Sequence, residues 1–220
     1  EIWRHIGGDL DRKGLLIVVS GFAGSGKGTL MKRLVEDYEG YALSVSMTTR
    51  DPRPGEVYGR EYFFVSKEEF ERKIETGGLI EYASYVENYY GTPRDYVEEQ
   101  MAAGKDVVLE IEIQGALKVK KRFPDAVLIF VLPPGVEELY RRLKNRGTET
   151  EDVIRKRMSR AREEAGAIGE YDYIVINDEI DKSVRTLHGL IEAAHQTTGR
   201  NEEFIRGIRN DLEQLWKGEK

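Results

Sequence analysis

Residues 20–29 are Ser20-Gly21-Phe22-Ala23-Gly24-Ser25-Gly26-Lys27-Gly28-Thr29, a glycine-rich stretch that carries one lysine. It follows the aliphatic run Leu15 to Val19, which is typical of a parallel strand buried on both faces, and it precedes apolar residues at helical spacing, namely Leu30, Leu34 and Val35. Glycines let backbone N–H groups converge on an anion at the positive end of a helix, and Lys27 adds a point charge for the outer phosphates of a nucleoside triphosphate. The stretch therefore predicts a phosphate-binding loop rather than a plain strand-to-helix turn.

Position 28 departs from the usual form of such a loop. The pattern G-x-x-x-x-G-K-[ST] has a metal-binding hydroxyl after the lysine, but here Gly28 stands there and Thr29 follows one residue later. We expect Thr29, or Ser25, to position a metal ion through water. How magnesium is held is the question that this departure raises.

Composition limits the function classes. The chain has 220 residues, 40% of them hydrophobic, which suffices for the core of one α/β domain or of two small ones. It has no cysteine and three histidines, so Mg²⁺ brought by a nucleotide is the only metal expected. A net charge of -6 argues against broad binding to nucleic acid. We find no apolar run of the roughly 20 residues that span a bilayer and no signal peptide, so we expect a cytoplasmic protein without membrane contact.

Strand and helix patterns alternate along most of the chain. Further strands are expected at residues 42–47, 107–113, 126–132 and 171–176, and helices at residues 93–103, 136–145 and after Asp181. The helix at 93–103 is predicted to have Thr92 as N-cap, Pro93 as first residue and Gly104 just past its end. This alternation predicts a parallel sheet flanked by helices, with ligands beyond the carboxyl ends of the strands.

Two segments do not follow this alternation of strands and helices. Residues 44–91 are rich in proline, glycine and tyrosine and suggest a small mixed α+β insertion with one helix at 67–75, where Ser66 and Glu69 have capping-box spacing. Residues 146–162 suggest a charged helix with a capping box at Thr148 and Glu151.

A second motif lies just past the second predicted strand. Residues 44–56 read Ser-Val-Ser-Met-Thr-Thr-Arg-Asp-Pro-Arg-Pro-Gly-Glu, and their paired guanidinium groups suit a phosphate dianion. With these residues the chain resembles the guanylate kinase family. Further matching motifs are Ile80-Glu81-Tyr82-Ala83, Asn88-Tyr89-Tyr90-Gly91-Thr92, residues 109–116 (Leu-Glu-Ile-Glu-Ile-Gln-Gly-Ala), residues 146–151 (Arg-Gly-Thr-Glu-Thr-Glu) and Val175-Ile176-Asn177-Asp178, so the resemblance covers residues 14–195.

The resemblance implies transfer of the γ-phosphate of ATP to GMP, and to dGMP, with Mg²⁺ as cofactor. It implies a P-loop core of residues 1–43, 92–145 and 164–198, a GMP-binding insertion at 44–91 and a helical lid at 146–163. It places ATP on Gly21, Phe22, Ala23, Gly24, Ser25, Gly26, Lys27, Gly28, Thr29, Arg146 and Asn177. GMP would contact Ser46, Arg50, Arg53, Tyr62, Glu81, Tyr90, Thr92 and Glu110, and the groups acting on the transferred phosphate would be Lys27, Arg50, Arg142 and Arg157.

The chemistry of guanine agrees with that assignment. Guanine presents two adjacent donors, N1–H and the 2-amino group, and one carboxylate such as Glu81 can accept both. A hydroxyl of Ser46 or Thr92 can donate to guanine O6, where adenine has an amino group instead. The wrong base leaves buried polar groups of such a site unpaired, which can lower its kcat/KM by orders of magnitude relative to guanine.

Several assignments leave alternatives open. Glu110 and Glu112, two apart in an expected strand, point either into the site or to solvent. The lid arginines either reach phosphates or form surface ion pairs, and Asn177 either bonds adenine or begins a turn with Asp178. A guanylate-kinase-like module that binds phosphopeptides without catalysis is the alternative function, and a kinase for a phosphorylated sugar is a third.

The last segment, residues 199–220, predicts an amphipathic helix that extends the core. Its apolar stripe comprises Phe204, Ile205, Ile208, Leu212, Leu215 and Trp216. The stripe would pack on the core beside Trp3 and Ile6 or form a homodimer through the terminal extensions, and its mixed charges argue against membrane binding.

Overall fold

The computed structural model describes residues 13–85, 87–145 and 150–218. The strands are β1 Leu16–Gly21, β2 Tyr41–Leu43, β3 Met47–Thr48, β4 Phe63–Phe64, β5 Leu79–Tyr85, β6 Asn88–Pro93, β7 Asp106–Glu110, β8 Val127–Leu132 and β9 Tyr173–Ile176. The helices are α1 Lys27–Asp37, α2 Lys67–Glu75, α3 Arg94–Ala102, α4 Ile113–Arg122, α5 Val136–Asn145, α6 Glu151–Ala165, α7 Ile180–His195 and α8 Glu202–Gly218, with 3-10 turns at Ile168–Glu170 and Thr198–Asn201.

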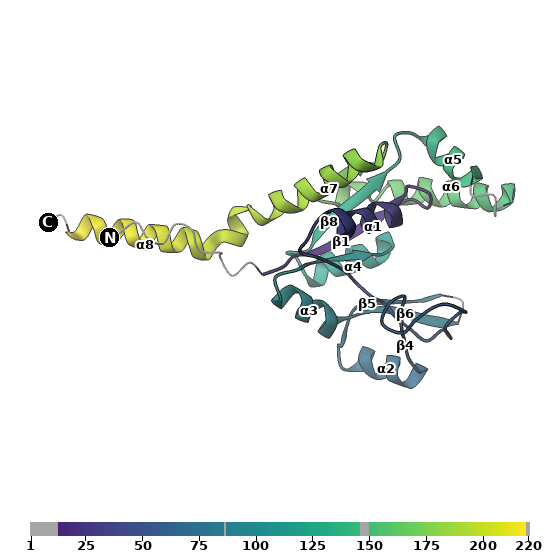
Figure 1. Cartoon of the computed structure of the whole chain (residues 1–220), viewed down its shortest axis with the longest axis horizontal. Helices are drawn as coiled ribbons and strands as arrows, with labels where there is room; N and C mark the ends of the chain where they lie inside the picture. The colour runs from purple at the N-terminus through teal and green to yellow at the C-terminus, as the bar shows by residue number, and fades with distance from the viewer. Residues whose placement is uncertain (1–12, 86, 146–149, 219–220) are drawn as a thin grey trace.

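The main sheet has five strands in the order β2-β7-β1-β8-β9, and each neighbouring pair is parallel. The strand β1 lies in the middle, and its residue Ile17 is in register with Val108 of β7 and Val127 of β8. Helices cover the sheet on both sides (Figure 1). The predicted parallel sheet flanked by helices is confirmed.

Alternate residues of β1 point into two cores, as a strand buried on both faces requires. On one face Ile17 and Val19 join apolar residues of α1 and α7, including Leu30 and Leu187. On the other face Leu16 and Val18 meet apolar residues of α3 and α4, including Val97, Ala116 and Val119. Because both cores clamp β1, the loop at its carboxyl end starts from a fixed point.

A second, smaller sheet has the order β4-β3-β6-β5, with both parallel and antiparallel pairs. Its core holds Met47, Phe70 of α2 and Leu79, and the ring of Phe70 stacks on Tyr89 with centroids 5.2 Å apart. The Ser66 hydroxyl caps α2 by accepting from the Glu69 N–H, as predicted. The predicted mixed α+β insertion is thus confirmed, and it lies below the main sheet in Figure 1.

Three expected strands were wrong in extent, and the one expected at 171–176 begins only at Tyr173. Residues 42–47 form two strands in different sheets, because Ser44 N–H bonds Val108 in the first sheet whereas the Ser46 carbonyl already accepts from Phe63 in the second. The strand expected at 107–113 ends at Glu110, and Glu112 is the N-cap of α4. The two carboxylates therefore do not share one strand face.

Two predicted helix starts were also wrong. Pro93, not Thr92, is the N-cap of α3, because Thr92 still belongs to β6. The charged helix α6 begins at Glu151, and the hydroxyl of Thr150 accepts from Val153 N–H; Thr148 lies outside the described residues.

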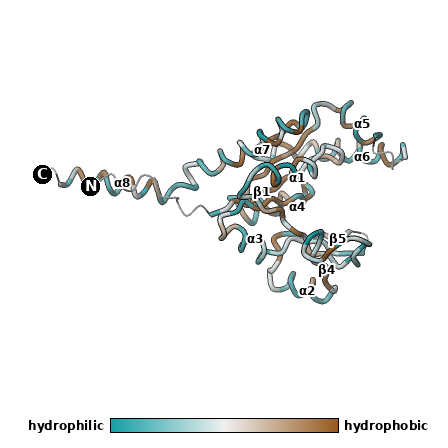
Figure 2. The backbone as a smooth tube through the Cα atoms, in the orientation of Figure 1, coloured by the Kyte–Doolittle hydropathy of each residue, from teal (hydrophilic) through white to brown (hydrophobic). Residues whose placement is uncertain are grey.

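Helix α8 leaves the core and runs away from both sheets (Figure 1). Its tube alternates between brown and teal in Figure 2, as expected of an amphipathic helix. Along it Phe204, Ile208, Leu212, Leu215 and Trp216 are exposed. Trp3 and Ile6, the predicted core partners, lie outside the described residues.

Candidate active site

The glycine-rich loop turns from β1 into α1 with two residues in the left-handed region. Gly24 has φ 90° and Gly26 has φ 87°, which only glycine adopts without strain. An added Cβ at Gly26 would lie 2.4 Å from Nδ2 of Asn177. The glycines are thus required both by backbone conformation and by close approach.

Side chains from two distant elements hold this loop. The Asn177 amide, which is buried after β9, donates to the Ser25 carbonyl at 2.8 Å. The Arg142 guanidinium on α5 donates to the Asn177 carbonyl at 2.9 Å. Asn177 therefore fixes the phosphate-binding loop, a role that differs from both sequence interpretations; an adenine contact stays a prediction.

The Lys27 ammonium lies inside the loop. Its Nζ donates to the carbonyl oxygens of Gly21 at 2.7 Å and Phe22 at 3.1 Å. These contacts hold the charge at the wall of a cavity of about 300 Å³. The cavity is lined by Ala23, Gly24, Gly26, Lys27, Gly28, Thr29, Glu110 and Arg157. Residues from the loop, the end of β7 and helix α6 thus meet around one space.

The Glu110 carboxylate lies close to position 28, where glycine has no side chain. An added Cβ on Gly28 would stand 3.8 Å from Oε2 of Glu110, so glycine keeps the space before this carboxylate open. The surrounding protein raises the pKa of Glu110 by desolvation, and the charge of Lys27 opposes that rise. Carboxylate and hydroxyl oxygens are the donors that Mg²⁺ prefers, usually through retained water, so Glu110 and Thr29 fit such an ion.

The predicted base-recognition pair lies on the small sheet. The Thr92 hydroxyl, fully buried, donates to Oε1 of Glu81 at 2.8 Å. Burial raises the pKa of Glu81, while the Thr92 hydrogen bond and Lys118 lower it. An added Cβ at Gly115 would approach Oε2 of Glu81 to 3.4 Å, so α4 meets the carboxylate closely. Glu81 is thus an oriented acceptor whose ionised form is costly without a ligand.

The Glu81→Gln protein is expected to be more stable than the parent at pH 8. A carboxyl whose pKa is raised by folding favours the native state only while protonated, so its contribution is lost as pH rises through the raised value. Glutamine keeps the acceptor for Thr92 without the charge, and we expect Tm to rise by about 2–4 °C, equivalent to about 1 kcal/mol. The difference in Tm between the variant and the parent should vanish below the ordinary pKa of glutamate. Calorimetry at pH 8 and at a pH below that value checks this. A Tm of the variant below that of the parent at pH 8 would contradict the prediction.

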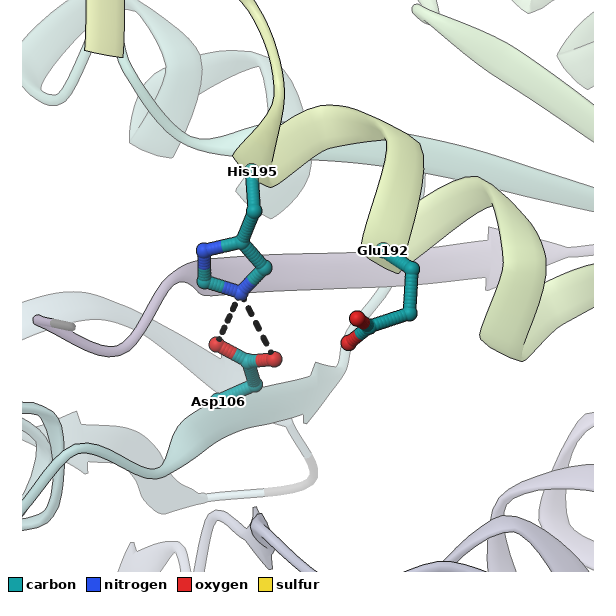
Figure 3. A group of neighbouring side chains, drawn as sticks. All are labelled: Asp106, Glu192 and His195. Atoms are coloured by element: carbon teal, nitrogen blue, oxygen red, sulfur yellow. Dashed lines mark hydrogen bonds and ion pairs between the residues drawn. The ribbon is translucent and has the colours of Figure 1, made fainter. Parts of the chain in front are cut away.

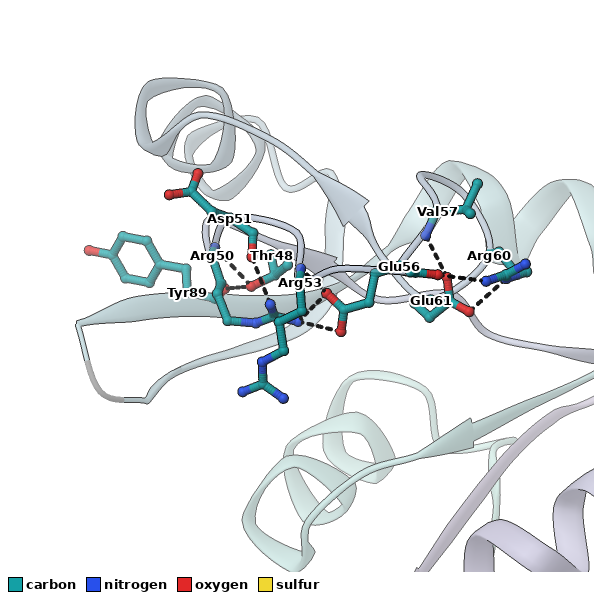
Figure 4. A network of polar contacts seen from close by, with 10 residues as sticks. Thr48, Arg50, Asp51, Arg53, Glu56, Val57, Arg60, Glu61 and Tyr89 are labelled. Carbon is teal, nitrogen blue, oxygen red and sulfur yellow. Dashed lines mark hydrogen bonds and ion pairs between the residues drawn. The ribbon is translucent and has the colours of Figure 1, made fainter.

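The arginines of the proline-rich turn form a polar network (Figure 4). Nη2 of Arg50 donates to both oxygens of Glu56 at 2.9 Å, and Nη1 donates to the Asp51 carbonyl at 2.7 Å. The guanidinium lies 5.5 Å from the ring centre of Tyr62, whose own ring lies 6.0 Å from that of Tyr90. Three of the predicted phosphate ligands are therefore gathered at one place.

Sequence reasoning gave Glu56 no role, although it stands in the quoted motif. Its carboxylate accepts from the Arg53 N–H at 2.7 Å and from Arg50, and these bonds lower its pKa. The Arg53 side chain is exposed and points away from Glu56 (Figure 4). The sequence did contain a signal for this contact, because Glu56 follows Arg53 by three residues and a turn brings residues at that spacing together.

The other predicted residues are partly placed. Ser46 lies on the connection between β2 and β3. Arg142 lies against the loop, with its Nε bonded to Glu138, whose pKa is lowered to about 2 by Arg141 and Arg142. Glu112 pairs with Arg160 of α6 at 2.7 Å, a contact that the sequence did not predict. Arg146 lies outside the described residues.

Comparisons with known proteins agree on one family. The family model described as Guanylate kinase matches residues 13–194. The guanylate kinase of Caldanaerobacter subterraneus subsp. tengcongensis is 48% identical over 202 residues, covering 92% of this chain and 98% of that one. That of Halalkalibacterium halodurans is 54% identical over 183 residues, or 83% and 90%. The solved guanylate kinase of Anaplasma phagocytophilum superposes with TM-score 0.66 at 33% identity, covering 86% of this chain and 90% of that one.

Proposed function

Because this chain belongs to the guanylate kinase family, we propose that it transfers the γ-phosphate of ATP to GMP, giving ADP and GDP. The cavity shared by Lys27, Glu110 and Arg157 carries the proposal, because it joins the phosphate-binding loop to the lid helix and to the strand end beside it. The non-catalytic phosphopeptide module has no such observation in its favour among the described residues.

Phosphoryl transfer asks a protein mainly for position and positive charge. In the proposed reaction Lys27 and the loop amides hold the ATP phosphates, and Arg142 and Arg157 stabilise charge on the equatorial oxygens. Arg50, Arg53, Tyr62 and Tyr90 hold the GMP phosphate in line for attack. The attacking group is already a phosphate anion, so no general base is required.

We further propose Mg²⁺ as the cofactor. Bound with ATP, it would neutralise negative charge on the ATP phosphates. Thr29 would hold it through water, and Glu110 would orient water on the side that Gly28 leaves open. Ser25, within the loop, is fully buried, which favours Thr29 for this role.

A coupled assay of diphosphate formation tests the function. With ATP as donor we expect turnover of GMP and dGMP, and kcat/KM for AMP and UMP lower by about three orders of magnitude or more. Equal use of AMP or UMP would overturn the assignment of the acceptor, and no turnover with any of them would overturn catalysis.

We also propose a cytoplasmic protein that acts without nucleic acid or membrane. The net charge of -6 supports the first of these exclusions. Within the described residues, no helix combines the length and the apolar content that a bilayer crossing demands.

A homodimer through α8 is proposed from the exposed apolar residues on that helix. We expect Leu212→Glu to halve the mass seen by sedimentation, because a charge would enter the apolar stripe. Glu213→Gln, next to the stripe on the same helix, is the control. A parent protein that sediments as a monomer at every concentration would contradict the dimer.

A further inference from the structure

Three side chains outside the active site bring their metal-ligating atoms together. Asp106 starts β7, and Glu192 and His195 lie one turn apart on α7. One ligand atom from each lies within 4.8 Å of the others. Figure 3 shows the Glu192 carboxylate turned toward the Asp106–His195 pair. The cluster is at the amino ends of the parallel strands, opposite the edge that carries the phosphate-binding loop.

The pair at its centre is nearly buried and already oriented. His195 Nε2 lies 2.9 and 3.0 Å from the two Asp106 oxygens, and their side chains are 9% and 5% exposed. The Leu15 N–H donates to the same carboxylate at 2.7 Å, which fixes its plane. Such a contact acts as an outer partner that holds a metal ligand in place.

We propose that Asp106, Glu192 and His195 form a site for a divalent transition cation, with Zn²⁺ as the best fit. One imidazole and two carboxylates match the nitrogen and oxygen donors of zinc sites, and water takes the fourth position. Tetrahedral bonds of about 2.0–2.1 Å place neighbouring ligand atoms about 3.3 Å apart, close to the Asp106–His195 distances. A Glu-x-x-His spacing on one helix is a recurrent way of presenting two ligands to one ion.

Charge supports a cation at this place. Asp106 and Glu192 contribute two carboxylates, which are anionic donors for a divalent ion. Glu192 and His195 keep some solvent exposure, so an ion has access.

The bound ion would tie the end of α7 to the main sheet. Asn201 Nδ2 donates to the His195 carbonyl at 2.8 Å, directly before α8 begins. The site would therefore stabilise the root of the α8 extension and leave the phosphate-binding loop unchanged.

Zinc titration of the metal-stripped full chain, without nucleotide, tests this proposal. Calorimetric titration and thermal unfolding should show one site and a higher Tm with Zn²⁺. Glu192→Gln, which leaves the Asp106–His195 pair intact, should weaken binding at least about tenfold, as should His195→Gln if it folds. His188→Gln is the matched control, because that imidazole pairs with Tyr41 elsewhere on α7.

The outcomes are decisive whatever the enzyme's activity. A parent protein without zinc-dependent stabilisation, or Glu192→Gln binding zinc as tightly as the parent, would overturn the site. If His188→Gln were the variant that lost zinc binding, while Glu192→Gln kept it, zinc would bind elsewhere and the proposed site would be overturned too.

Discussion

The Lys27→Ala enzyme is expected to lose about three orders of magnitude in kcat. The Gly21 and Phe22 carbonyls hold the Lys27 ammonium at the wall of the cavity beside the loop, so it is positioned before any ligand arrives. Charged groups placed in advance where charge develops account for factors of about 10²–10³ each in mutational studies, and cationic groups in phosphoryl transfer reach about 10³–10⁵. Steady-state rates at saturating ATP and GMP measure the loss.

Lys32→Ala is the matched control for this variant. Lys32 lies on the same helix, and its side chain is 74% exposed. It forms an ion pair with Glu36 at the surface. Its removal should leave kcat within about twofold and Tm unchanged. Lys27→Met keeps the aliphatic stem and should be as slow as Lys27→Ala. A Lys27→Ala enzyme with near-full rate would contradict the proposed role of the loop.

Glu81→Gln is expected to lower kcat/KM for GMP by about 10³-fold while the KM for ATP stays the same. A glutamine offers one acceptor and presents an amide donor to the N1–H and 2-amino donors of guanine, so a donor then faces a donor. Sites built to hydrogen-bond a substrate penalise an unmatched partner by about 10⁴–10⁵. The Thr92 bond that orients the side chain remains available to glutamine.

Two further variants isolate this effect. Glu71→Gln makes the same change on the exposed face of α2 and should leave both Michaelis constants unchanged. Thr92→Val removes the orienting hydroxyl but keeps the carboxylate, so its loss with GMP should be smaller, about tenfold. Full GMP activity in Glu81→Gln would refute guanine recognition by this carboxylate.

Local patterns predicted the elements that depend on nearby residues. The aliphatic run Leu15 to Val19 and the glycines after it lie in β1 and the phosphate-binding loop almost as expected. Ser66 caps α2 because the cap and its partner are three residues apart. Arg50, Tyr62 and Tyr90 could be grouped from the family resemblance, and the structure brings them together.

Long-range contacts account for what the sequence did not predict. The single strand expected at 42–47 ignored the change of sheet after Ser44, which depends on hydrogen bonds to Val108 and Phe63. The apolar alternation of Ile111 and Ile113 continued past Glu110, so it hid the start of α4. The hydrogen bond from the Asn177 amide to the Ser25 carbonyl joins residues 152 positions apart, and no local sequence pattern predicts such a contact.

The link between Asn177 and Ser25 has a consequence for protein synthesis. The loop is synthesised before the donor that fixes it, which follows 152 residues later, directly after the edge strand β9. Chains emerge from the amino terminus at about 5–20 residues per second, so for several seconds the nascent loop lacks this contact. A nascent chain that ends before Asn177 lacks the amide that holds its phosphate-binding loop, so we expect it to bind nucleotide more weakly than the finished core.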